Sequence, residues 1–230
     1  MKIIFIIPSW HYWADPLKHQ PYWELYFATH IRNSGYDVEI FDMRAAVSDN
    51  LEGAMNLIPV GDFYFFWIFK TGDASEVYAI ARFLKQKFPH SLNAAGGTHV
   101  DKTPIEASEK LDSIIVGPGE KAFVALIEDE KNKVRKKRYQ TDYKAVPFSE
   151  TVHPDRSFLP DEAIVNNKIF SEYGNIPATL TYFSRGCIYK CAFCTYNVPN
   201  SLQVRGETQI LDEISYLKER YKIKGLLIKD

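Results

Sequence analysis

Residues 184–196 read SRGCIYKCAFCTY and contain all three cysteines of this 230-residue chain. Cys187, Cys191 and Cys194 are spaced C-x3-C-x2-C, so three thiolates from one short loop can converge on a single centre. An iron–sulfur cluster normally takes four cysteine ligands. Three cysteines without a fourth therefore predict a [4Fe-4S] cluster in which one iron is open to another ligand. The rest of the chain is interpreted as a scaffold for this loop.

Three other interpretations of the cysteines stay open. A structural zinc site needs a closed set of four ligands, and the nearest histidine, His153, lies 34 residues before Cys187. A thioredoxin-like redox pair formed by Cys191 and Cys194 leaves Cys187 unexplained and lacks the usual flanking pattern. Three buried, unreactive thiols are the third possibility, and the grouping of all three within eight residues argues against it.

With the aromatic Phe193 directly before the last cysteine, the loop resembles the cluster loop of the radical S-adenosylmethionine (radical SAM) superfamily. The resemblance implies that S-adenosylmethionine chelates the open iron and is cleaved reductively to a 5'-deoxyadenosyl radical. It also implies that Phe193 lies near the adenine, and that a one-electron reductant such as flavodoxin or ferredoxin serves a small-molecule or peptide substrate. Residues 179–184 are expected to form the first barrel strand, with Arg185 and Gly186 turning the chain beyond its carboxyl end.

The composition is that of an ordinary globular protein. The chain has 46% hydrophobic and 25% charged residues, and 28 basic side chains balance 29 acidic ones. A net charge of −1 gives no overall field that favours nucleic acid or a membrane surface. The apolar run at residues 3–7 ends at Pro8 and is too short for a signal peptide or a membrane span. An odd-numbered cysteine cluster is no disulfide framework, so we expect a cytoplasmic protein.

Apolar runs alternate with helical patterns along the first half of the chain. Strands are predicted at residues 3–7, 37–41, 63–69, 91–95 and 113–116, and helices at 23–31, at 74–88 and from Glu120 to about residue 130. Continuous apolar strands are typical of parallel sheets that are covered on both faces. The predicted fold class is therefore α/β, with a Rossmann-like (flavodoxin-like) doubly wound parallel sheet.

Residues 1–130 resemble the cobalamin-binding-like domain that precedes the radical SAM core in many enzymes. The matching segments are residues 2–8, 35–42, 96–99 and 116–120. The resemblance implies a corrinoid cofactor, cobalamin, and assigns cofactor contacts to Gly96, Gly97, Thr98, Gly117, Gly119 and Glu120. The Asp-x-His-x-x-Gly motif of the methionine-synthase type is absent, which implies that cobalt is bound without a protein imidazole. A flavodoxin-like domain whose glycines only make turns, and which binds no cobalamin, is the alternative.

Two other segments were considered as sites. The loop at residues 9–21 carries aromatic and histidine residues, and it is either a cofactor lid or a packed interdomain surface. His11, His30 and His99 are interpreted as ordinary loop or helix residues rather than metal ligands. The basic run at residues 132–138 is interpreted as a solvated linker, since so short a run offers few phosphate contacts; an RNA contact is the alternative.

Residues 131–176 are predicted to be a linker, and residues 177–230 the N-terminal part of a partial (β/α) radical SAM barrel. A helix after Gly206 and a strand at residues 225–228 fit that pattern. Relatives of this kind need further strand–helix units, so we expect a fragment or truncated form that exposes an apolar sheet edge.

The sequence is thus identified as a member of the radical SAM superfamily of the cobalamin-dependent type, which implies methyl transfer or another radical reaction. A methylthiotransferase acting on tRNA is disfavoured, because that family has a second, N-terminal cysteine cluster and residues 1–186 contain no cysteine. The remaining alternatives are a non-catalytic corrinoid or small-molecule binding module with a vestigial barrel, and a radical SAM enzyme that does not bind cobalamin.

Overall fold

The computed structural model describes every residue except 11–13, 19, 47–49, 152, 190 and 195–200. Much of the predicted aromatic loop, namely His11, Tyr12, Trp13 and His19, therefore lies outside the described residues. None of the helices in the described ranges is long and apolar enough to cross a membrane.

Six strands form the main sheet, in the order β2-β1-β3-β4-β5-β6, and each neighbouring pair is parallel. The chain starts at β1, steps to β2 on one side and then moves outward through β3 on the other. This topology confirms the predicted doubly wound sheet. The strands are β1 (Lys2–Ile7), β2 (Asp37–Asp42), β3 (Phe63–Trp67), β4 (Leu92–Gly96), β5 (Ser113–Val116) and β6 (Arg138–Gln140).

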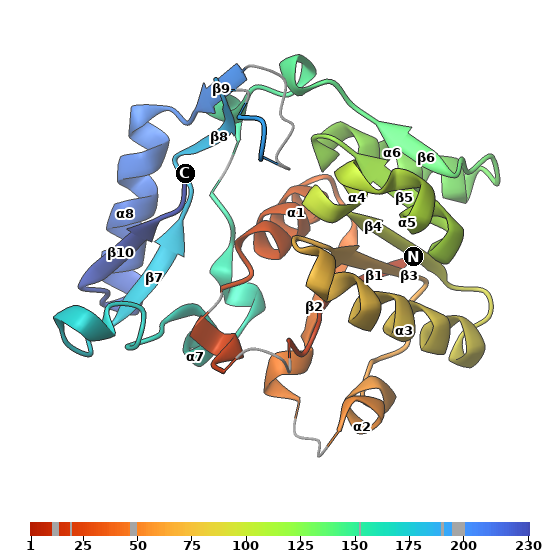
Figure 1. Ribbon diagram of the computed structural model, residues 1–230, viewed down its shortest axis with the longest axis horizontal. Helices are drawn as coiled ribbons and strands as arrows, with labels where there is room; N and C mark the ends of the chain where they lie inside the picture. The colour runs from red at the N-terminus through yellow and green to blue at the C-terminus, as the bar shows by residue number, and fades with distance from the viewer. Residues whose placement is uncertain (11–13, 19, 47–49, 152, 190, 195–200) are drawn as a thin grey trace.

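Alternate residues of the central strands enter two separate cores, because successive side chains of a strand point to opposite faces. Phe5 of β1 lies in the core that also contains residues of α1 and α6, whereas Ile6 lies in the core that contains residues of α3 and α5. Helices thus cover both faces of the sheet (Figure 1). The helices of this part are α1 (Tyr22–Asn33), α2 (Leu51–Asn56), α3 (Thr71–Lys87), α4 (Thr98–Lys102), α5 (Pro104–Lys110) and α6 (Gly119–Lys131).

A second, smaller unit follows (Figure 1). Strand β7 (Ala178–Thr181) pairs in parallel with β10 (Gly225–Ile228), and α8 (Glu207–Tyr221) lies between them in the chain. Between β7 and α8, strands β8 (Ser184–Cys187) and β9 (Ser201–Val204) form an antiparallel pair. A strand–helix–parallel strand unit is the repeat from which (β/α) barrels are built. The predicted start of a barrel is therefore confirmed.

A buried triad of two arginines and one glutamate joins the linker to this second unit. Glu213 of α8 is fully buried; its Oε1 lies 2.6 Å from Nη2 of Arg156, and its Oε2 pairs with Arg205. Thr181 of β7 also donates a 3.0 Å hydrogen bond to Glu213. Burial alone would raise the pKa of Glu213, but the two guanidinium groups outweigh it and hold this pKa below its usual range. The carboxylate is therefore ionised and fixes three elements together.

The structure differs from the sequence-based expectation around the cysteine loop. The first barrel strand ends at Thr181 rather than at Ser184. Arg185 and Gly186, expected in a turn, instead belong to β8, where they pair with Gln203 and Leu202. The partner strand comes after the cysteines, so local sequence carries little information about this pairing.

Several short elements were not predicted. Helices α4 and α5 divide at Pro104, and neither is long enough to show an apolar period. Strand β6 has only three residues, two of them exposed, and includes Arg138 from the basic run. It pairs with β5, so the main sheet continues beyond residue 130 into the range interpreted as linker. The linker itself contains α7 (Asp161–Ile164) and four short 3-10 segments: residues 143–145, 148–150, 156–158 and 171–173.

Gly97, between β4 and α4, is a position where no other residue fits. Its φ of 107° lies in the region that L side chains rarely adopt. A Cβ atom there would lie 2.6 Å from the carbonyl oxygen of Ile68. Gly72, in the first turn of α3, is a contrasting case: its φ is ordinary, and a Cβ atom would meet nothing within 4 Å.

We expect Gly97→Ala to lower the free energy of unfolding by at least about 2 kcal/mol, because backbone strain and a clash with fixed backbone add together. The matched control Gly72→Ala should be neutral or slightly stabilising, since alanine is the better helix former. Urea unfolding followed by circular dichroism measures both. Equal midpoints for Gly97→Ala and the parent chain would contradict this assignment.

Candidate functional site: a cleft between two parallel sheets

A cleft of 1190 Å³ lies between the main sheet and the second unit. The main sheet contributes the segments that follow β3, β4 and β5, and the second unit contributes residues at the carboxyl ends of β7 and β10 together with β8. Ligands of α/β proteins bind beyond the carboxyl ends of parallel strands, and here two such edges face each other. The lining residues are Trp23, Phe27, Trp67, Phe69, Lys70, Thr71, Thr98, His99, Asp101, Lys102, Thr103, Gly117, Pro118, Tyr143, Tyr182, Ser184, Arg185, Gly186, Cys187, Ile228, Lys229 and Asp230.

The cysteine loop joins β8 to β9 at the edge of this cleft. Cys187, the last residue of β8, is half-buried and lines the cleft, whereas Cys191 and Cys194 are exposed. The backbone N–H of Cys194 donates a 3.0 Å hydrogen bond to the carbonyl of Cys191, which turns this part of the loop back on itself. All three side chains are thiols in the same loop.

The structure does not gather the predicted ligands into a metal centre. In the described residues, no three His, Cys, Asp or Glu side chains converge as a metal site would require. Phe193 is 89% exposed and does not line the cleft. The metal-ligand roles of the cysteines and the adenine contact of Phe193 therefore stay predictions.

The predicted cofactor contacts divide into two groups. Thr98 and Gly117 line the cleft, whereas Gly96, Gly97 and Gly119 do not. The glycine requirements that the structure shows are internal: a Cβ on Gly117 would lie 2.6 Å from the carbonyl oxygen of Thr141, and one on Gly119 would lie 2.8 Å from the ring of Phe27. These glycines therefore shape the loops that border the cleft.

Glu120, the remaining predicted contact, is turned away from the cleft and is only 2% exposed. Its Oε1 accepts hydrogen bonds from Arg185 Nη1 at 2.6 Å and from the Tyr26 hydroxyl at 2.8 Å. Arg185 also donates to the carbonyl of Val146 and to Gln203 Oε1. Because Arg185 lies two residues before Cys187, this buried pair connects α6 directly to the base of the cysteine loop.

Asp101 and His99 border the cleft, and neither is predicted as a site residue from the sequence, where His99 is interpreted as an ordinary loop or helix residue. Asp101 accepts a 2.7 Å hydrogen bond from the backbone N–H of Gly117, which fixes the loop after β5. His99 is 2% exposed, and its Nε2 lies 3.0 Å from the Tyr78 hydroxyl. Burial lowers the pKa of His99, so its imidazole is neutral at pH 7. The one signal in the sequence was their position directly after a buried strand.

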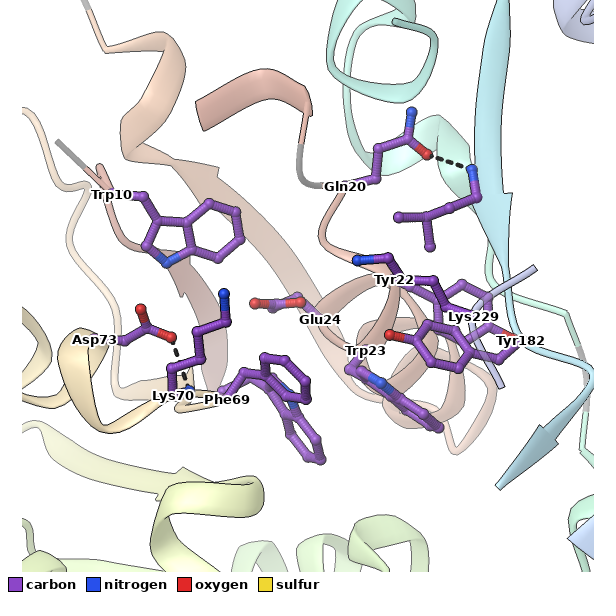
Figure 2. A pocket seen from close by; sticks show the side chains of 12 residues that line it. Trp10, Gln20, Tyr22, Trp23, Glu24, Phe69, Lys70, Asp73, Tyr182 and Lys229 are labelled. Atoms are coloured by element: carbon purple, nitrogen blue, oxygen red, sulfur yellow. Dashed lines mark hydrogen bonds between the residues drawn. The ribbon is translucent and has the colours of Figure 1, made fainter. Parts of the chain in front are cut away.

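A smaller compartment of 140 Å³ adjoins the cleft (Figure 2). Glu24, in the first turn of α1, lines it and is only 3% exposed. Burial raises the pKa of Glu24 to about 7, although its own backbone N–H and the charge of Arg44 act in the opposite direction. Glu24 was not singled out from the sequence, because one glutamate at the start of a helix is common.

The parallel domain, the strand–helix–strand unit and the C-x3-C-x2-C loop fit what the comparisons found, since the proteins similar to this chain include cobalamin-dependent radical SAM enzymes. No protein-family model matches the chain. The chain is 24% identical over 159 residues to bacteriochlorophyllide d C-8(2)-methyltransferase of Chlorobaculum tepidum, covering 69% of this chain and 32% of that protein. It is 27% identical over 177 residues to the cobalamin-dependent radical SAM methyltransferase TokK of Streptomyces tokunonensis, covering 66% and 24%.

A third relative is the anaerobic magnesium-protoporphyrin IX monomethyl ester cyclase of Rubrivivax gelatinosus. It is 20% identical, and the match covers 100% of this chain and 45% of that protein. Solved structures show the same fold. OxsB with aqua-cobalamin bound has a TM-score of 0.73 at 17% identity, covering 100% of this chain and 34% of that one. TsrM from Kitasatospora setae, with cobalamin and a [4Fe-4S] cluster bound, has a TM-score of 0.66 at 15% identity, covering 100% and 49%. The chain thus spans less than half of each relative.

We expect Arg185 and Glu120 to be strongly coupled in stability. Replacing Arg185 by Met leaves a buried carboxylate without its cation, which should cost about 3 kcal/mol of unfolding free energy. Glu120→Gln should also destabilise, because it leaves the guanidinium uncompensated. The double variant should lose less than the sum of the two, by at least about 1 kcal/mol, in urea unfolding. Simple additivity would show that the two side chains do not interact.

Glu24 should make the stability of the chain depend on pH. Its pKa is raised to about 7 in the folded state, whereas an unfolded glutamate ionises near 4.3. The unfolded state therefore loses its proton first, and the folded state loses stability as pH rises between these values. Glu24→Gln removes the titrating carboxyl group. The unfolding free energy of the variant should therefore exceed that of the parent chain by on the order of 2–3 kcal/mol at pH 8 and by much less at pH 5. A pH-independent difference in urea midpoints would contradict the shifted pKa.

Proposed function

We propose that this chain forms the corrinoid-facing and cluster-bearing part of a radical SAM enzyme, with methyl transfer as the leading reaction. The observation that carries the proposal is the shared cleft. Cys187 of the cysteine loop lines the same 1190 Å³ space as Thr98 and Gly117, which follow strands β4 and β5 of the parallel sheet. One cavity therefore adjoins both a predicted cluster ligand, Cys187, and the carboxyl edge of the parallel sheet.

The residues present fit the groups that the proposal requires. Cys187, Cys191 and Cys194 supply three soft sulfur donors from one loop, which suits an iron–sulfur cluster with an open iron. The cleft is of the size that large cofactors occupy, and its walls combine aromatic side chains with a few polar groups. His99 has a buried, neutral imidazole already held by Tyr78, so we do not assign it to cobalt.

The bound groups would supply one-electron reductive cleavage of S-adenosylmethionine to methionine and a 5'-deoxyadenosyl radical, with a corrinoid as methyl carrier. The chain's own residues hold and orient the loops that border the cleft. Arg185 fixes the base of the cysteine loop through Glu120, and Asp101 fixes the loop at Gly117. Asp230 accepts hydrogen bonds from the backbone N–H groups of Phe183 and Ser184, both at 2.9 Å, and so orders the start of β8.

The partners that this reaction needs are a one-electron reductant, such as flavodoxin or ferredoxin, and a small-molecule or peptide substrate. Two of the three relatives are named for an activity on a substrate of their own, and the low identities support only the shared chemistry for this chain. The three free thiols suit a reducing compartment, so we propose a cytoplasmic location.

Anaerobic reconstitution followed by ultraviolet–visible spectroscopy and iron and sulfide analysis tests the cluster. We expect about four iron and four sulfide per chain, since a [4Fe-4S] cluster is predicted. The variant in which Cys187, Cys191 and Cys194 are all replaced by Ala should hold almost none. Equal iron in the parent chain and in this variant would sink the cluster assignment.

Retention of hydroxocobalamin through gel filtration tests the cleft separately. We expect about one corrinoid per chain, because one cleft of this size joins the two units. Thr98→Trp places a large ring at the cleft wall and should abolish retention. The matched control Thr208→Trp, at an exposed position of α8 outside the cleft, should retain it. If the cluster forms but neither the parent chain nor the two variants retain corrinoid, the enzyme belongs among radical SAM proteins without cobalt.

A further inference from the structure

The compartment that contains Glu24 is a side chamber of the main cleft rather than an isolated void. Its lining includes Trp10, Gln20, Tyr22, Glu24, Asp73 and Leu180, which are absent from the lining of the cleft. The two spaces share the residues Trp23, Trp67, Phe69, Lys70, Tyr182 and Lys229. A ligand can therefore place one end in the chamber while its body remains in the cleft.

The chamber has aromatic walls. The rings of Trp23 and Trp67 are stacked with centroids 5.7 Å apart, and Trp23 lies 5.0 Å from Tyr182. Tyr22 lies 4.8 Å from Tyr182, so the wall runs continuously from α1 to the second unit. Aromatic faces attract organic cations and also stack on flat apolar groups.

Glu24 is the one acidic group on the chamber lining that lacks a partner among the other described residues. The residue is only 3% exposed, and its carboxylate accepts a hydrogen bond from its own backbone N–H. The nearby cation Arg44 is held by Asp42, which accepts from its Nε at 2.8 Å and from its Nη2 at 2.5 Å. A buried carboxylate without a cation of its own is costly, so the site favours a ligand that brings one.

Two lysines also line the chamber. Lys70, after β3, and Lys229, after β10, are both lining residues, and in Figure 2 their amino ends turn toward the space in front of Glu24. Burial lowers the pKa of Lys70, and the charge of Lys229 lowers it further, as expected for two ammonium groups that share a space. The chamber therefore offers positive charge to an anionic group of a ligand.

We propose that the chamber binds the aminocarboxylate head of a zwitterionic ligand, with its ammonium on Glu24, its carboxylate toward Lys229, and its body along Trp23 and Trp67 in the cleft. The ligand class is an amino acid, distinct from the S-adenosylmethionine that the proposed function places at the cysteine loop. Calling this ligand the substrate of the enzyme rests on the proposed function. The chamber's preference for a zwitterion does not rest on it.

Calorimetric titration of the full 230-residue chain with three matched probes tests the proposal. L-Phenylalanine carries both charges, phenethylamine lacks the carboxylate, and phenylpropanoate lacks the amine. We expect L-phenylalanine to bind at least about tenfold more tightly than either of the others, since each missing charge removes a charge-assisted hydrogen bond. Lack of saturable binding of L-phenylalanine, or equal binding of the three probes, would overturn the proposal.

Two variants assign the charges. Glu24→Gln should bring the affinity for L-phenylalanine down to that for phenylpropanoate, and Lys229→Met should bring it down to that for phenethylamine. Glu109→Gln and Lys110→Met, both at exposed positions of α5, are the matched controls and should bind as the parent chain does. Unchanged binding by Glu24→Gln, in a variant whose circular dichroism is native, would also overturn the proposal.

Cluster content and corrinoid retention measured on the same preparations separate the two hypotheses. Chains that select L-phenylalanine but take up neither group would keep the chamber and lose the radical SAM function. Chains that hold both groups but do not distinguish the three probes would keep the function and lose the chamber assignment.

Discussion

The buried ion pair between Arg185 and Glu120 is the contact on which the relation between the two units depends. It joins Glu120, in the first turn of α6, to Arg185, which lies two residues before Cys187. Both side chains are at most 5% exposed, so the interaction is little screened by water. Separating the two partners leaves an uncompensated buried charge, so other orientations of the loop have a higher free energy.

A second set of buried charges acts in the same way within the second unit and its linker. Arg156 comes from the linker, Arg205 follows β9, and both contact Glu213 of α8. In both networks each buried charge requires a specific partner, so the contacts are directional. The cysteine loop between β8 and β9 is therefore held at both ends by directional contacts, while Cys187 lines the cleft and Cys191 and Cys194 are exposed.

The parts that could be predicted from the sequence are those with local signals. Strands such as β1 and β5 are continuous apolar runs because they are buried on both faces, and β5 was predicted to the residue. The β8–β9 pair could not be predicted, since Cys187 pairs with Ser201 across a long loop. Glu120 was correctly located after β5, but its inward direction depends on Arg185, 65 residues away. Long-range partners, rather than local pattern, decide such cases.

The same reasoning explains why the side chamber escaped the sequence analysis although its residues are spread over familiar elements. Glu24 starts α1, Trp67 ends β3, and Lys229 follows β10. Each has an ordinary explanation alone: a helix-start acid, an apolar strand residue and a surface lysine. Only the docking of the second unit against α1 brings them to one space. Because that docking is fixed by the buried ion pairs, the chamber and the cysteine loop keep the same position relative to each other. A site that presents one end of a ligand to a reactive centre requires such a fixed position.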